Sequence, residues 1–166
     1  SSRVRRTKRS DKNSIETPEA GSTIRLCIKD QIHQKTHRYG GACHMARIRG
    51  QAFLATGQAE ICAVVSQHME TARVCAAELN CSLYGDHIGC LAEGRPDAVL
   101  IETPHKAQDE IAVWALEEDL DLLIGGSLAC SLASGTRITE MAVQRGRIVE
   151  AGYQRRYDVS GRRSVD

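Results

Sequence analysis

The stretch of sequence that decides the fold is PDAVLIETPHKAQDEIAVWALEED, residues 96–119. Its first part, residues 97–103, is a short aliphatic run without polar alternation, which is typical of a strand buried on both faces of a parallel sheet. Pro104 then leads into apolar residues at helical spacing, which predicts a helix over residues 106–118. Trp114 falls in the apolar stripe of that helix, so we expect it to pack in the core. The stretch therefore reads as a strand, a turn and a helix.

The same alternation extends in both directions along the chain, from residue 23 onward. Short runs rich in β-formers alternate with longer amphipathic segments, which is the signature of βαβ units. The predicted strands are 23–28, 59–66, 81–84, 97–103, 120–125 and 147–153, and the predicted helices are 43–56, 69–80, 86–93, 106–118 and 131–145. Gly57 follows the first helix and Ser131 is the expected cap of the last. The sequence predicts an α/β fold, doubly wound, with a mostly parallel Rossmann-type sheet and helices on both faces.

Composition narrows the class of protein. The 166 residues are 42% hydrophobic and 26% charged, which suits one globular domain, and they contain no apolar run of membrane-spanning length. The formal net charge of +1 and the 4% aromatic content disfavour binding to nucleic acid or to an anionic membrane.

Residues 1–22 are polar and carry a basic cluster, so we expect a disordered tail before a nucleotide-binding domain at residues 23–157. The cluster consists of Arg3, Arg5, Arg6, Lys8 and Arg9, and it fits either a solvated arm or a nuclear-targeting or phosphate-binding segment. We expect residues 158–166 to be a tail or the start of a second domain.

The seven cysteines are odd in number and irregularly spaced, which does not fit a disulfide framework. Most lie among aliphatic residues, as Cys62, Cys75 and Cys130 do, where cysteine behaves as a small hydrophobe. We therefore expect reduced thiols and a cytoplasmic protein.

Four residues, which include two histidines spaced i, i+4, are potential metal ligands: His33, His37, Cys43 and His44. No paired-cysteine spacing accompanies them and the segment is polar, so the sequence predicts no metal.

Three segments together resemble the nucleotide-binding half of the glucose-fructose oxidoreductase, inositol dehydrogenase and rhizopine-catabolism (Gfo/Idh/MocA) family. They are ATGQAEICAVVS at 55–66, the stretch at 96–119, and AGYQRRYD at 151–158. The resemblance covers about residues 40–157, and it implies NAD or NADP as cofactor.

The resemblance places the pyrophosphate loop at RYGGACH, residues 38–44. It implies backbone contacts to the phosphates from Gly40, Gly41 and Ala42, where small residues allow close approach. The first glycine of the family motif has become Arg38, and the polar insertion KDQIHQKTHRY at 29–39 separates strand from loop. A surface turn that opens a helix is the alternative interpretation.

The resemblance also assigns the ends of the second and fourth strands to the cofactor. Ser66 stands where a carboxylate would favour NAD, so NADP becomes admissible, although an ordinary turn serine fits as well. The turn of Thr103, Pro104 and His105 would lie under the nicotinamide ribose, and Arg156 matches the crossover into a second domain.

The resemblance fails where the family carries a Glu-Lys-Pro triplet, because the matching residues are Gly125, Gly126 and Ser127. The family's lysine assists proton transfer at the nicotinamide, and glycine has no group for that task. No catalytic residue is therefore assigned, and whether the chain is an enzyme stays open.

The leading functional prediction is the cofactor domain of an oxidoreductase that acts on a sugar, polyol or related hydroxyl. The alternative is a catalytically inactive Rossmann domain that senses a nucleotide or binds a protein partner. The expected partners are the nucleotide and, with a second domain, a small sugar or polyol, with no nucleic acid and no membrane. The sequence does not fix the oligomeric state and admits a homo-oligomer.

Overall fold

The computed structural model describes residues 23–30, 42–66 and 68–154. Six strands form one sheet in the order β3-β2-β1-β4-β5-β6, and every neighbouring pair is parallel. The strands are β1 (Ile24–Asp30), β2 (Ala59–Ser66), β3 (Ser82–Tyr84), β4 (Ala98–Glu102), β5 (Asp121–Ile124) and β6 (Val149–Ala151). This order confirms the predicted Rossmann-type sheet.

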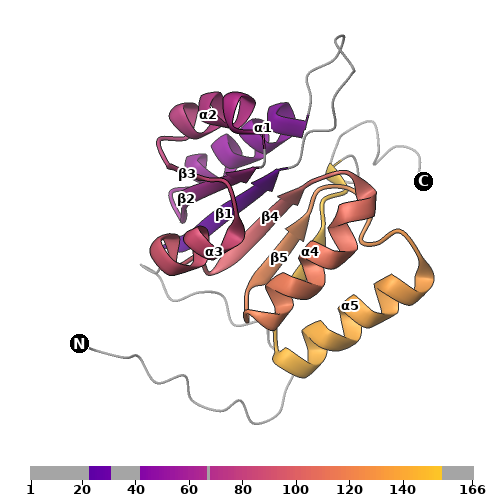
Figure 1. Ribbon diagram of the computed structural model, residues 1–166. Coiled ribbons are helices and arrows are strands. Elements are labelled where there is room, and N and C mark those ends of the chain that lie inside the picture. The colour runs from indigo at the N-terminus through magenta and orange to yellow at the C-terminus, as the bar shows by residue number, and fades with distance from the viewer. Residues whose placement is uncertain (1–22, 31–41, 67, 155–166) are drawn as a thin grey trace, which may run out of the picture.

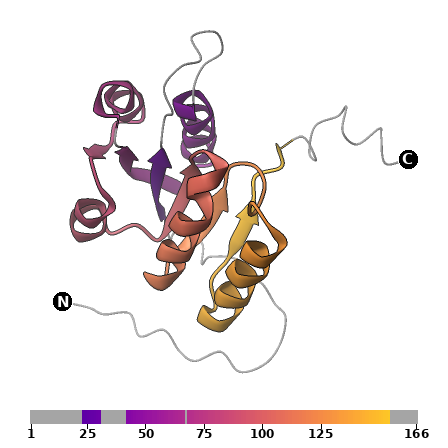
Figure 2. The same ribbon diagram turned by 45° about the vertical axis from the view of Figure 1, so that its right-hand side comes forward.

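Helices cover both faces of the sheet, as Figures 1 and 2 show. They are α1 (Ala42–Ala55), α2 (Met69–Glu78), α3 (His87–Gly89), α4 (His105–Glu117) and α5 (Leu132–Arg145), with a π-helical turn, η1 (Cys90–Gly94), directly after α3. The helices α1 and α2 pack on one face, whereas α4 and α5 pack on the other.

The strands are apolar on both faces because each face has its own core. On β4, Leu100 belongs to the core beneath α1 and α2, whereas Val99 and Ile101 belong to the core beneath α4 and α5. All three side chains are buried. Successive strand residues point to opposite faces, so an uninterrupted aliphatic run is what a doubly covered strand requires.

The predicted helix ends were correct within two residues for α1, α2, α4 and α5. Ser131 caps α5 as expected, since its side chain accepts a hydrogen bond from the backbone N–H of Ser134. The helix predicted over 86–93 lies at residues 87–94, but it is α-helical only in α3 and continues as the π turn η1. In η1, Cys90 and Gly94 are buried, and Gly94 lies against the thiols of Cys62 and Cys90.

Two further expectations need correction. The predicted insertion was too long, since β1 continues through Lys29 and Asp30; residues 31–41 lie outside the described part of the chain. Cys130 is exposed rather than packed among aliphatic residues, and its thiol donates to the carbonyl oxygen of His105. Within the described ranges, none of the helices has the length and apolar character needed to cross a membrane.

Candidate functional site

The centre of the sheet carries the crevice expected of a doubly wound fold. The strands β1 and β4 are neighbours, with Asp30 beside Glu102 at their carboxyl ends. The helix α1 that follows β1 packs on one face of the sheet, and α4, which follows β4, packs on the other. Ligands of doubly wound sheets bind where the crossovers diverge in this way, beyond the carboxyl ends of the strands.

The described members of the predicted cofactor site gather at this edge. Ser66 is the last residue of β2 and pairs with Asp30 in the register of β1. Thr103 and Pro104 directly follow β4 at this edge. Ala42 is the first residue of α1. Gly40, Gly41 and Arg156 lie outside the described residues, and their assignment stays a prediction.

The turn from β4 into α4 is held by side-chain hydrogen bonds. The amide nitrogen of Gln108 donates to the carbonyl oxygen of Thr103 at 2.9 Å, and its amide oxygen lies 3.0 Å from Nδ1 of His105. Gln108 is buried, whereas His105 is exposed. A buried amide with both ends engaged gives the turn a fixed shape. The sequence did not single out Gln108, although a polar residue three positions into a helix that packs on a sheet is a usable signal.

Among residues 23–30, 42–66 and 68–154, the Thr103 hydroxyl has no hydrogen-bond partner, although the side chain is buried at the crevice. Leaving a buried hydroxyl unsatisfied costs about 1–3 kcal/mol, so such an atom calls for an explanation. A hydroxyl or phosphate oxygen of a bound nucleotide is one partner that fits this position.

Ser66 is fully buried, and its hydroxyl oxygen accepts a hydrogen bond from the backbone N–H of His68 at 3.1 Å. Within the part of the chain that the structure describes, this hydroxyl donates no hydrogen bond, so its proton can be donated to a ligand. The bond to His68 is typical of a serine in a turn, as the turn-residue interpretation expects. The hydroxyl proton is the group of Ser66 that a nucleotide would accept.

A buried ion pair at the same edge was missed by sequence reasoning. Nη1 of Arg49, from α1, donates to Oε1 of Glu102, and the side chains are 13% and 6% exposed. Burial raises the pKa of Glu102, and the hydrogen bond and charge of Arg49 oppose that rise. A signal was present in the sequence, because a carboxylate at the end of a strand buried on both faces needs a cation.

Gly126, the second residue after β5, has a backbone conformation that favours glycine. Gly126 has φ +130°, a conformation that residues with a side chain rarely adopt. Its nearest side-chain neighbour is Cε1 of His105, 3.6 Å from where a Cβ would stand. Position 126 therefore lacks the family's lysine in sequence and also has a backbone that disfavours one.

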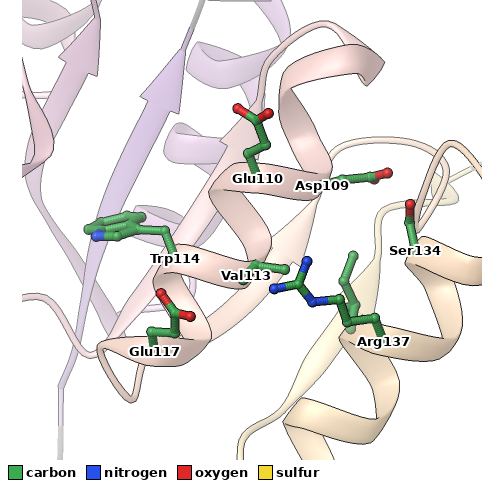
Figure 3. Close-up of a pocket in the computed structure, with 8 residues that line it drawn as sticks. Asp109, Glu110, Val113, Trp114, Glu117, Ser134 and Arg137 are labelled. Carbon is green, nitrogen blue, oxygen red and sulfur yellow. The ribbon is translucent and has the colours of Figure 1, made fainter.

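A groove between α4 and α5 lies outside this edge (Figure 3). Its lining includes Val113, Trp114 and Glu117 from α4 and Arg137 from α5, and none of the predicted cofactor residues. Trp114 packs against the core but is only partly buried, so the core-packing prediction holds in part.

The thiols of Cys62 and Cys81 are poor candidates for chemistry. A hydrogen bond with Cys90, together with burial, raises the pKa of Cys62, and burial raises that of Cys81 to about 11. Thiols of this kind stay protonated at neutral pH and are weak nucleophiles. His33 and His37 of the metal hypothesis lie outside the described residues, and within those residues no three potential metal ligands gather.

The comparison with known families fits this geometry. Residues 40–153 match the model of the Gfo/Idh/MocA group, described as an oxidoreductase family with an NAD-binding Rossmann fold. The chain belongs to the Gfo/Idh/MocA family. The described residues 42–66 and 68–153 thus form most of its NAD-binding Rossmann domain, as the sequence resemblance predicted.

Individual members of the Gfo/Idh/MocA family show where the likeness lies. Inositol 2-dehydrogenase 1 of Saccharopolyspora erythraea is 28% identical over 123 residues, which is 72% of this chain and 35% of that protein. The chain spans about a third of the length of the curated relatives it matches.

Two solved structures of similar fold contain the cofactor. The structure of GenD2 from gentamicin A biosynthesis in complex with NAD has a TM-score of 0.75 at 15% identity, and covers 86% of this chain and 38% of that one. Myo-inositol dehydrogenase from Lactobacillus casei, in complex with NAD(H) and myo-inositol, gives 0.66 at 20% identity, with coverage of 82% and 38%. At these identities the likeness shows the fold.

Proposed function

We propose that this domain binds NAD or NADP across the crevice between β1 and β4. The pyrophosphate would lie against Gly40, Gly41 and Ala42, where the first N–H groups of α1 lack helical partners. The adenosine ribose would lie near Ser66, and the nicotinamide ribose against the turn that begins at Thr103. Support comes from the described members of this set, which share the carboxyl edge of the sheet.

When bound, the nicotinamide ring supplies the carbon that accepts or donates hydride. The residues of this chain orient that ring: the fixed turn after β4 presents the Thr103 hydroxyl, and His105 opens α4 beside it. The proposed substrate is a sugar or polyol hydroxyl, because relatives are named as inositol dehydrogenases. Arg156 would belong to the crossover segment that leads from this domain to the substrate-binding region.

The single observation that carries the proposal is the buried hydroxyl of Thr103 at the crevice, which no side chain or backbone group of the described residues pairs. Thr103→Val keeps the shape of the side chain and removes the hydroxyl. We expect the nucleotide-free variant to be as stable as the wild type or slightly more so, because an unsatisfied polar group is lost. Affinity for NADH should fall about threefold to tenfold, the worth of one hydrogen bond.

Calorimetric titration with NADH and thermal unfolding without ligand measure the two effects separately. Thr136→Val, on the exposed side of α5, is the matched control and should change neither the affinity nor, by much, the melting temperature. A Thr103→Val variant that loses stability without nucleotide and binds NADH normally would contradict the proposal.

The phosphate loop has its own test. Gly40→Val should weaken NADH and NADPH binding by about tenfold or more, since a side chain there blocks close backbone approach. Unchanged affinity in the folded variant would remove the loop from the site.

We propose that hydride transfer to or from a sugar or polyol needs a proton-handling group that position 126 does not supply. Gly126 offers no proton-handling group, and general acid or base help is worth about 10²–10⁴-fold. We therefore expect no sugar or polyol oxidation above background from this chain with NAD(P)⁺, and robust turnover would contradict the assignment. The comparisons give no support to the nucleotide-sensor alternative. A cytoplasmic location and a homo-oligomer also remain proposals.

A further inference from the structure

The space beside Gly125, directly after β5, is filled by charged groups that come from elsewhere in the chain. A Cβ on Gly125 would overlap Oε2 and Cδ of Glu102 and Nη1 of Arg49, closer than non-bonded atoms come. Glu102 reaches this point from the end of β4, and Arg49 reaches it from α1. Gly125 is therefore glycine because a carboxylate and a guanidinium occupy the place of its side chain.

The guanidinium of Arg49 is anchored on several sides. Nη1 bonds Glu102, while Nη2 donates to the carbonyl oxygen of Gly152 at 3.2 Å and to Oε1 of Gln154 at 2.8 Å. Gly152 also lies close, since a Cβ there would stand 3.3 Å from Nη2. One arginine thus joins α1 to the ends of β4 and β6, with a glycine on either side of it.

These contacts join the two walls of the proposed cofactor crevice. The helix α1 begins at Ala42, beside the proposed pyrophosphate site, and Glu102 directly precedes Thr103 at the proposed nicotinamide end. Misplacement of a positioning group by about 1 Å can cost two orders of magnitude in function. A fixed ion pair between the walls is therefore suited to set their separation.

We propose that Glu102 is a positioning residue of the nucleotide site, and that its carboxylate occupies the place that a side chain of residue 125 would take. The inference rests on the proposed nucleotide binding. If the inference is correct, an acid is tolerated at position 102 or at position 125 but not at both. The chain has Glu102 with Gly125, and the exchanged pair is a small residue at 102 with an acid at 125. Aspartate is the matching acid at 125, because its carboxylate begins one bond beyond the Cβ that would overlap Glu102. The Cβ would also overlap Nη1 of Arg49, so the exchange requires the end of the Arg49 side chain to shift toward the new carboxylate.

Four variants test the exchange: Glu102→Ala, Gly125→Asp, the double variant Glu102→Ala/Gly125→Asp, and the neutral control Glu102→Ala/Gly125→Asn. Each is assayed for its NADH dissociation constant by calorimetry and for its melting temperature without nucleotide. Both single variants should bind NADH at least about tenfold more weakly, because one leaves Arg49 unpaired and the other crowds two carboxylates. The aspartate double variant should return to within about threefold of the wild type, and the asparagine control should not.

The outcomes separate the possible roles. If folded Glu102→Ala binds NADH as the wild type does, the pair is structural only and the proposal is overturned. Equal behaviour of the aspartate and asparagine double variants would also overturn it, since the charge would then not matter. Failure of the wild type to bind NADH or NADPH would refute the proposed function and with it the positioning role, while melting temperatures would still show whether the acids at 102 and 125 exchange.

Discussion

Replacing Arg49 by methionine tests how much the domain depends on the ion pair. Methionine keeps the apolar stem of the side chain and removes the guanidinium, so the loss reports mainly the charge. Glu102, 6% exposed, would keep its charge without a partner, and Gly152 and Gln154 would lose a donor. Breaking one side of a buried pair costs about 3–5 kcal/mol, a large share of the roughly 5–15 kcal/mol that stabilises a domain.

The cost should depend on pH in a defined direction. Burial raises the pKa of Glu102 and Arg49 opposes the rise, so removal of Arg49 lets the pKa rise further. A carboxyl whose pKa is higher in the folded than in the unfolded state contributes stability at acid pH, and that contribution is lost as the pH rises through the folded pKa. The destabilisation should therefore be small near about pH 4, the ordinary range for a glutamate, and reach its full size above the raised pKa.

Urea denaturation followed by circular dichroism at several pH values measures this difference. Arg47→Met is the matched control, because Arg47 lies on the same helix and pairs with Glu78, and these two side chains are 35% and 36% exposed. The expected loss at such a site is below about 1 kcal/mol. Arg49→Met/Glu102→Gln should recover most of the loss at neutral pH. Equal, pH-independent losses for Arg47→Met and Arg49→Met would refute the reasoning.

Three further outcomes follow from single positions. Gly126→Ala and Gly126→Lys should both lower stability by about 1–3 kcal/mol in thermal unfolding, since φ +130° is the cause in each; a neutral alanine variant would contradict this. NADPH should bind no worse than NADH, and Ser66→Asp should shift preference toward NADH through repulsion of the 2′-phosphate; a clear NADH preference of the wild type in titrations would count against it. Ser131→Ala should cost about 1 kcal/mol in urea denaturation through loss of the α5 cap, and no change would show that the cap is dispensable.

The architecture could be predicted because its determinants are local. Aliphatic runs such as residues 59–66 and 97–103 identify doubly covered strands, and helical spacing between them identifies the crossovers. Parallel strands end at one edge, so residues at strand ends, Ser66 and Thr103 among them, were expected to lie together before any contact was known. The helix predicted at residues 86–93 lies at residues 87–94, but the sequence pattern did not show that its second part is a π turn.

The sequence indicates that Glu102 needs a cation, but it does not identify Arg49, because the two residues are 53 positions apart and belong to different elements. Helical spacing places Arg49 on α1 without saying what it faces, and Glu102 looks like part of a turn motif. The hydrogen bonds from Arg49 to Gly152 and Gln154 span more than a hundred positions. Such contacts follow from tertiary packing, which single-sequence patterns do not encode.

Positions 125 and 126 show why an aligned residue does not determine a local environment. The sequence shows two glycines where the family resemblance expects an acid and a lysine. The structure gives each glycine a different reason: Gly125 makes room for Glu102 and Arg49, and Gly126 takes a left-handed backbone. An acid at 125 therefore requires a smaller residue at 102 and a shift of the Arg49 side chain, whereas a lysine at 126 requires the backbone of the turn to change. Side-chain changes are less costly than a change of backbone conformation, so we expect the family's acid to be tolerated at 125 in this background and the lysine not to be tolerated at 126.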